Sequence, residues 1–139
     1  MRLEDLAVGQ TAEFAKTITD ADVTLFAGVT GDFNPVHIDE TAAQRSRFGG
    51  RIAHGMLSAG IISATIAGKL PGPGSIYLSQ TLRFTAPVRI GDTVTASVSI
   101  LEILTAKRRV RLSTVCRNQN GATVLDGEAT VLVEDSHDP

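Results

Sequence analysis

The sequence predicts an α+β fold in which a curved antiparallel sheet wraps around one central apolar helix. Two observations lead to this prediction. Residues 55–68 form an apolar run without a polar face, which is typical of a buried helix. Residues 76–134 instead alternate apolar and polar side chains, which is typical of strands with one solvated face. Strands joined by short turns pair antiparallel, and their apolar face needs a cover that the helix provides.

Length and composition fit one soluble globular domain. The chain has 139 residues, of which 42% are hydrophobic and 20% are charged. A chain of this size buries roughly two thirds of its unfolded surface around a single core. The formal net charge of −2 gives no electrostatic reason to expect nucleic acid as a partner.

Cysteine content and hydropathy predict a cytoplasmic protein without membrane contact. The start of the chain, Met1 to Leu6, lacks the apolar stretch of a signal peptide, and Cys116 is the single cysteine. The longest uncharged apolar run, Met56 to Ala67, is shorter than the roughly 20 residues that span a bilayer.

The first half of the chain reads as one strand followed by short helices. Residues 11–18 alternate weakly and predict a strand. Thr19 with Asp22 forms a capping box that starts a helix, which Gly28 and Gly31 are expected to end. Two short segments follow the loop at 32–37: helical turns over 39–43 and a flexible connection over 47–51.

The second half reads as a helix and four strands. Pro71 to Gly74 ends the apolar helix, and residues 76–85 predict one alternating strand. The Asn120-Gly121 pair is the strongest hairpin signal. The remaining three strands are expected over 93–100, 109–117 and 125–134. Because an open sheet leaves unpaired edges, we expect a homodimer that joins the edges of two sheets.

The segment from Asp32 to His37 places a carboxylate, an amide, a proline and an imidazole within six positions. Pro35 disfavours a helical Asn34, so the segment is expected to be a bent loop that points Asp32 and His37 at one spot. A carboxylate and an imidazole differ by about two pKa units and can divide proton removal and delivery on a shared water. The same residue types also form ordinary turns, and for Asn34 a structural role is favoured.

The chain resembles the MaoC-like, R-specific enoyl-CoA hydratases of the hot-dog fold over nearly its whole length. Residues 1–139 are therefore expected to form a single domain of this kind. The resemblance rests on three segments: Asp32-Phe33-Asn34-Pro35-Val36-His37, Phe48-Gly49 with Ile52-Ala53-His54-Gly55-Met56, and Leu82-Arg83-Phe84-Thr85-Ala86-Pro87-Val88. It implies reversible addition of water to a trans-2-enoyl-CoA, giving an (R)-3-hydroxyacyl-CoA, with neither a cofactor nor a metal.

The resemblance also implies roles for individual residues. Asp32 and His37 hold the water, the Gly55 backbone N–H binds the thioester carbonyl, and Ser63 lies near the pair as a substrate-binding residue. Apart from the resemblance, the Asn34 amide is a further candidate for orienting water or substrate. The physical argument for Gly55 is independent, because conjugate addition develops negative charge on the thioester oxygen and a helix start offers free N–H groups.

Other residues have simpler expected roles. We expect His54 to brace the loop, His137 to be inert in a polar tail, and Cys116 to be a buried small hydrophobe. The cluster at 107–111 is expected to lie on a solvated sheet face. Six further basic residues stay open as contacts for coenzyme A phosphates: Arg45, Arg47, Arg51, Lys69, Arg83 and Arg89.

Three alternative functions remain open from the sequence: an acyl-CoA thioesterase, a 3-hydroxyacyl-thioester dehydratase acting on another carrier, and a non-catalytic hot-dog subunit that only binds an acyl thioester. The acyl chain length depends on which residues between Met56 and Ile66 line the pocket. The pathway, whether polyhydroxyalkanoate synthesis or fatty-acid metabolism, is not specified by the residues.

Overall fold

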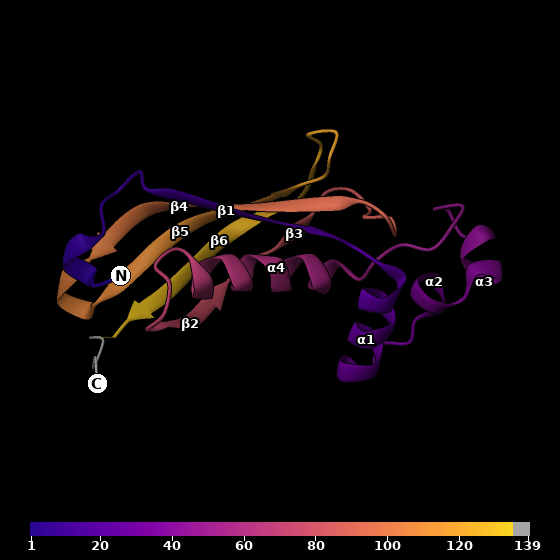
Figure 1. The fold of residues 1–139 in the computed structure, drawn as a ribbon, viewed down its shortest axis with the longest axis horizontal. Helices are drawn as coiled ribbons and strands as arrows, with labels where there is room; N and C mark the ends of the chain where they lie inside the picture. Colours follow the sequence, from indigo (N-terminus) through magenta and orange to yellow (C-terminus); the bar gives the residue numbers. More distant parts are fainter. Residues whose placement is uncertain (135–139) are drawn as a thin grey trace.

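The computed structural model describes residues 1–134 and is built on one six-stranded antiparallel sheet (Figure 1). The strands are β1 (Thr11–Thr17), β2 (Ser75–Gln80), β3 (Arg83–Phe84), β4 (Thr93–Leu104), β5 (Arg109–Arg117) and β6 (Thr123–Val133). The helices are α1 (Asp20–Thr30), α2 (Pro35–Ile38), α3 (Glu40–Gln44) and α4 (Gly55–Gly68), with short 3-10 turns at Leu3–Asp5 and Thr105–Lys107. The predicted α+β class is confirmed.

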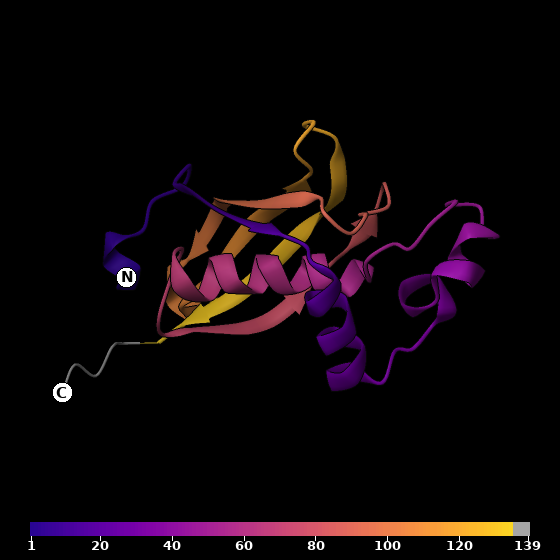
Figure 2. The same cartoon turned by 45° about the vertical axis from the view of Figure 1, so that its right-hand side comes forward.

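The sheet runs in the order β1-β4-β5-β6-β2, and β3 also pairs with β6. Figure 2 shows α4 lying along one face of the sheet, between β1 and β2. The alternation predicted for β4 and β5 is present, and their inward side chains form one core with α4. Ile62 of α4, Val98 of β4 and Leu112 of β5 are all fully buried in that core.

Among residues 1–134, part of the surface of α4 is exposed, so the prediction of a helix buried on most sides is wrong for the single chain. Ile61, Ile62 and Ile66 are buried, whereas Met56 is 54% exposed. The exposed side also carries Gly60, Ala64 and Ala67 and has no charged residue. Within the part of the chain that the structure describes, this face borders open cavities, one of which Phe14 of β1 and Phe26 of α1 also line, and it is not closed over by another element.

The single strand predicted over 76–85 is in fact two strands. A bulge between Tyr77 and Ser79 shifts the register of β2 against β6, so the alternation expected from period two is lost. The chain then crosses β6 closely, where a Cβ on Gly127 would lie 1.8 Å from the Thr81 carbonyl oxygen. The edge strand β2 therefore exposes Ile76, Tyr77 and Leu78 together.

The sequence signals predicted for the two ends of α1 and for the β5–β6 turn are present in the structure. The Thr19 hydroxyl and the Asp22 carboxylate form the capping box of α1. Gly31 ends that helix at φ 82°, a left-handed conformation that glycine adopts readily, whereas Gly28, also expected at its end, lies inside the helix. Asn120 and Gly121 lie in the β5–β6 turn. Among residues 1–134, each helix is too short or too polar to cross a membrane.

Candidate active site

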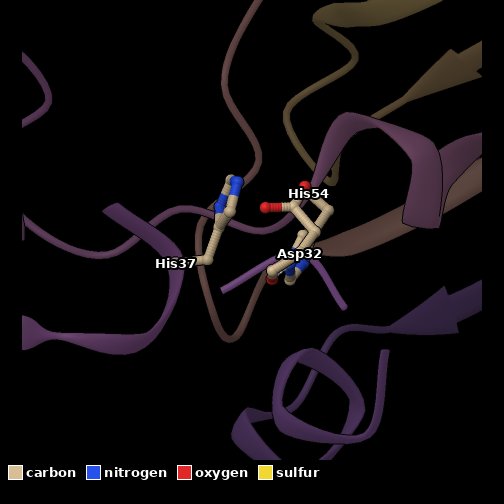
Figure 3. Close-up of side chains that lie close together, drawn as sticks. All are labelled: Asp32, His37 and His54. Atoms are coloured by element: carbon tan, nitrogen blue, oxygen red, sulfur yellow. Dashed lines mark hydrogen bonds between the residues drawn. The ribbon is translucent and has the colours of Figure 1, made fainter. Parts of the chain in front are cut away.

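Asp32, His37 and His54 come together at the start of α4. One ligand atom from each side chain lies within 4.8 Å of the other two. Figure 3 shows the Asp32 carboxylate directed toward the His37 ring, with His54 beside them. The sequence motif therefore brings its carboxylate and its imidazole to one spot, as the spacing predicts.

Asp32 is held by the end of α1. Its N–H donates to the Thr30 hydroxyl at 3.2 Å, directly after the left-handed Gly31. One carboxylate oxygen, Oδ1, accepts the Asn34 N–H at 3.2 Å and closes a turn. The residue is exposed, and its second carboxylate oxygen, Oδ2, accepts no hydrogen bond from residues 1–134.

His37 belongs to a helix and not to a loop, which corrects the prediction for this segment. Pro35 occupies the first position of α2, where its missing N–H costs nothing, and the Asn34 side chain caps the helix by accepting the Val36 N–H at 3.3 Å. The favoured structural role of Asn34 is thus present in the fold. The short helix turns His37 inward, to 9% exposure.

The hydrogen bond of His37 fixes its tautomer. Nδ1 lies 2.8 Å from the Ile52 carbonyl oxygen, and a carbonyl only accepts, so Nδ1 carries the proton. The neutral ring then has its lone pair on Nε2, where it can take a proton from water. Ile52 is itself held by a backbone bond to Val36 and a bridge to Arg89.

Gly55 is the first residue of α4, so its N–H has no partner within the helix. It lines a cavity of about 420 Å³ together with His37. A Cβ at Gly55 would lie 2.5 Å from Cε1 of Phe84, a half-exposed residue of the same cavity. The bare Cα therefore leaves room that a side chain would take.

Asp32 lines a second cavity, of about 560 Å³, and Met56 borders both cavities. The second cavity is bounded by Phe26 of α1, by α4 and by Tyr77 and other residues around the β2 edge. The carboxylate and the imidazole thus stand where two apolar spaces meet. A long, thin molecule with a polar centre fits this arrangement.

The two serines of α4 differ in position. Ser63 is partly buried and lines neither of these two cavities, so the role expected for it stays a prediction. Ser58 lines the first cavity, is 2% exposed and has a hydroxyl without a hydrogen-bond partner among the described residues. Sequence reasoning missed Ser58, because a serine on an apolar helix gives no signal of its surroundings.

Some of the six basic residues that could contact coenzyme A phosphates are already engaged with other groups in the structure. Arg51 donates to the His37 carbonyl at 2.7 Å and pairs with Asp20, so the connection at 47–51 is anchored at its end. Arg83 pairs with Asp126. Arg47 lines the first cavity and lies over the Phe48 ring. The 107–111 cluster lies partly on the outer sheet face, where Arg111 pairs with Glu102 and Glu128.

The three clustered side chains are a poor metal site. The His37 and His54 rings are stacked, with centroids 3.9 Å apart and planes 28° from parallel. Imidazole lone pairs lie in the ring plane, so the nitrogens of stacked rings do not converge on one ion. Two ring nitrogens are also already engaged with backbone carbonyls.

Two groups near the site have altered acidity. Burial raises the pKa of Cys116 to about 12, consistent with the expected small hydrophobe. Burial, followed by the nearby Cys116, raises the pKa of Tyr77 to about 12. Tyr77 bonds to Gln80, which also lines the second cavity. His137 lies outside the described residues.

The comparisons with known proteins agree with each other. The family model described as MaoC like domain matches residues 5–124. The chain is 53% identical to an (R)-specific enoyl-CoA hydratase of Rhodospirillum rubrum, covering 94% of this chain and 90% of that protein. It is 52% identical to a 3-hydroxybutyryl-CoA dehydratase of Methylorubrum extorquens, covering 94% and 82%. The solved R-hydratase PhaJ1 of Pseudomonas aeruginosa superposes with a TM-score of 0.90 at 49% identity, covering 99% and 93%.

Proposed function

Because this chain belongs to the MaoC-like domain family, we propose that it is an (R)-specific enoyl-CoA hydratase, a hydro-lyase that reversibly adds water to a trans-2-enoyl-CoA. The observation that carries the proposal is the Asp32–His37 pair, which stands at the meeting of two cavities beside the free N–H of Gly55. The product is an (R)-3-hydroxyacyl-CoA.

Water is activated between Asp32 and His37. Its oxygen bonds to C3 of the enoyl group, and one water proton passes to the pair. The electrons of the double bond move toward the thioester and form an enolate, and C2 then receives a proton from the same pair. The lone pair on Nε2 of His37 and the open carboxylate oxygen of Asp32 supply the acceptors that this exchange needs.

Gly55 stabilises the charge that develops. The enolate oxygen lies at the start of α4, where an unpaired N–H and the helix dipole favour negative charge. Donors of this kind contribute about 10²- to 10³-fold in rate when they are aimed at the developing oxyanion. Phe84, packed on the bare Cα of Gly55, forms an apolar wall beside the thioester.

The reaction is proposed to need neither a cofactor nor a metal. Conjugate addition to a thioester requires a base, an acid and an oxyanion donor, and the three residues named above supply them. The stacked rings of His37 and His54 also disfavour an ion at this position. Treatment with a chelator is therefore expected to leave kcat unchanged.

We further propose a homodimer in the cytoplasm. The exposed face of α4 and the exposed β2 edge, with Ile76 and Leu78, together form an unpaired apolar surface. A second copy that pairs edge to edge covers this surface and closes the cavity that Tyr77 borders. The single, buried Cys116 and a coenzyme A substrate suit a reducing compartment.

Incubation with crotonyl-CoA and with a saturated acyl-CoA tests the function. The proposal predicts loss of the conjugated-enoyl absorbance without release of free thiol, and no reaction of the saturated ester. Thiol release from both esters would indicate a thioesterase, and binding without turnover would indicate a non-catalytic subunit. A matched assay with crotonyl attached to an acyl carrier protein separates the carrier alternatives.

A further inference from the structure

His54 contacts both members of the catalytic pair while remaining shielded from solvent. The residue is 2% exposed and immediately precedes Gly55 at the start of α4. Its ring lies between Phe26, at 4.7 Å between centroids, and His37, at 3.9 Å. A side chain this deeply enclosed has little access to substrate, so it acts through its neighbours.

The hydrogen bond of His54 reaches the backbone of Asp32. Nε2 lies 2.9 Å from the Asp32 carbonyl oxygen, and since a carbonyl only accepts, Nε2 is the protonated nitrogen. The remaining nitrogen, Nδ1, is buried without a partner among the described residues. The ring is thus oriented by the Asp32 bond and by stacking.

The hydrogen bond from His54 to the Asp32 carbonyl connects the segment around Asp32 to a part of the chain that is distant in sequence. Within residues 1–134, the other hydrogen bonds of residues 31–34 reach no further than four positions along the sequence. The bond from His54 spans 22 positions and joins the segment to the start of α4. Without it, Asp32 is exposed and anchored only to its own turn.

Stacking on the His54 ring positions His37, the second member of the pair. The His37 ring is fixed at Nδ1 by the Ile52 carbonyl, and its face rests on the His54 ring. His54 therefore touches the Asp32 backbone and the His37 ring at once and lies next to the Gly55 N–H. The Asp32 carboxylate, the His37 ring and the Gly55 N–H are thus all positioned next to the same rigid side chain.

We infer that His54 is a positioning residue of the proposed hydration: its Nε2–H and its ring fix the separation of the Asp32 carboxylate and the His37 imidazole. The inference rests on the proposed function for its kinetic part. It goes beyond bracing a loop, because displacement of a reacting group by about 1 Å costs about 100-fold in rate. The His54 side chain makes no capping hydrogen bond to α4, so its replacement removes no helix cap.

Two variants separate the hydrogen bond from the ring. His54→Gln keeps an N–H donor at a similar reach and loses the ring, whereas His54→Phe keeps an aromatic ring and loses the donor. We expect His54→Phe to lower kcat on crotonyl-CoA at least about 10-fold with KM within about threefold, and His54→Gln to recover most of that loss. Melting temperature and circular dichroism give the folded fraction of each variant.

A turnover-independent measurement accompanies the kinetics. Nitrogen-15 relaxation dispersion should show added microsecond-to-millisecond exchange at residues 32–34 in His54→Phe and not in His54→Gln. Equal kcat per folded molecule in His54→Phe and wild type, or equal losses and equal exchange in both variants, would overturn the inference. A wild-type protein that does not hydrate crotonyl-CoA would overturn the proposed function, and the relaxation result would still decide the role of His54.

Discussion

At the scale of single residues, Gly55 shows most directly how the site depends on an absent side chain. Phe84 occupies the volume next to its Cα, and an added Cβ would approach the ring to 2.5 Å. Contacts this short force the ring or the helix start to shift. Either shift alters the Phe84 wall or the Gly55 N–H to which the thioester carbonyl is proposed to bind.

The Gly55→Ala variant is therefore expected to lose at least about 10-fold in kcat/KM for crotonyl-CoA and about 1–3 kcal/mol of stability. Steady-state kinetics and urea unfolding measure the two effects. Phe84→Ala, made alone and combined with Gly55→Ala, is the matched control. If the ring contact causes the loss, the double variant regains stability relative to Gly55→Ala; an additive loss speaks against the contact.

Cys116 is predicted to be an inert thiol in the folded protein. With a pKa near 12, about one molecule in 10⁴ carries a thiolate at pH 8, so a disulfide reagent should react far more slowly with native than with denatured protein. The folded state holds this proton more tightly than the unfolded state, whose thiol has a pKa of about 8.5. Stability is thus lost as the pH rises from about 8.5 toward 12.

Urea unfolding at pH 8 and pH 10 measures this loss, and Cys116→Ala provides the reference without the thiol. The wild type should lose up to about 2 kcal/mol more than the variant between these two pH values. Equal pH dependence of the two proteins, or rapid labelling of the native thiol, would contradict burial of Cys116.

The sequence indicated which residues come together at the candidate site better than it indicated the residues that hold them in place. Asp32 and His37 are close in sequence, so one motif revealed both. The bonds from His54 to Asp32 and from His37 to Ile52 join positions 22 and 15 apart, and such partners depend on tertiary packing. Ser58 has an unpartnered buried hydroxyl that no local pattern indicates.

At the scale of elements, the start of α1 depends on one capping box. The Thr19 hydroxyl accepts the Asp22 N–H at 3.1 Å, and the Asp22 carboxylate accepts the Thr19 N–H at 2.9 Å. The helix ends at Gly31, directly before Asp32. A frayed α1 therefore loosens the element that leads into the site.

Thr19→Ala should lower the free energy of unfolding by about 1 kcal/mol, because two N–H groups at the helix start lose or loosen their partners. Thr19→Ser keeps the hydroxyl and should stay within about 0.5 kcal/mol of wild type. Denaturant unfolding of the three proteins checks this difference, and equal stability of the alanine and serine variants would show that the cap contributes little.

Element prediction succeeded where one periodicity persists and failed where tertiary geometry interrupts it. β5 has the limits that its alternation predicts. β4 instead continues to Leu104, four residues past its predicted end, beyond a register shift between Ile100 and Glu102. β2 carries a bulge at the sheet edge, which reverses the facing of later side chains. α2 was predicted as a loop because Pro35 reads as a helix breaker, although proline at the first position begins a helix.

At the scale of the whole molecule, the uncovered apolar face of α4 and the β2 edge explain why a second copy is expected. Sedimentation equilibrium should give twice the 14.6 kDa of one chain. Ile76→Lys and Leu78→Lys place charge on this edge and should shift the protein toward monomer with reduced turnover. Val8→Lys, at another exposed apolar position, is the control, and a monomeric wild type would contradict the proposed dimer.

Asp32 and His37 are proposed to add water to an enoyl thioester with R stereochemistry. The most direct measurement is the rate and chirality of 3-hydroxybutyryl-CoA formed from crotonyl-CoA by the wild type, Asp32→Asn and His37→Ala. We expect the R product from the wild type and at least about a 100-fold lower kcat in each folded variant. Near-wild-type turnover in either variant, or the S product, would contradict it.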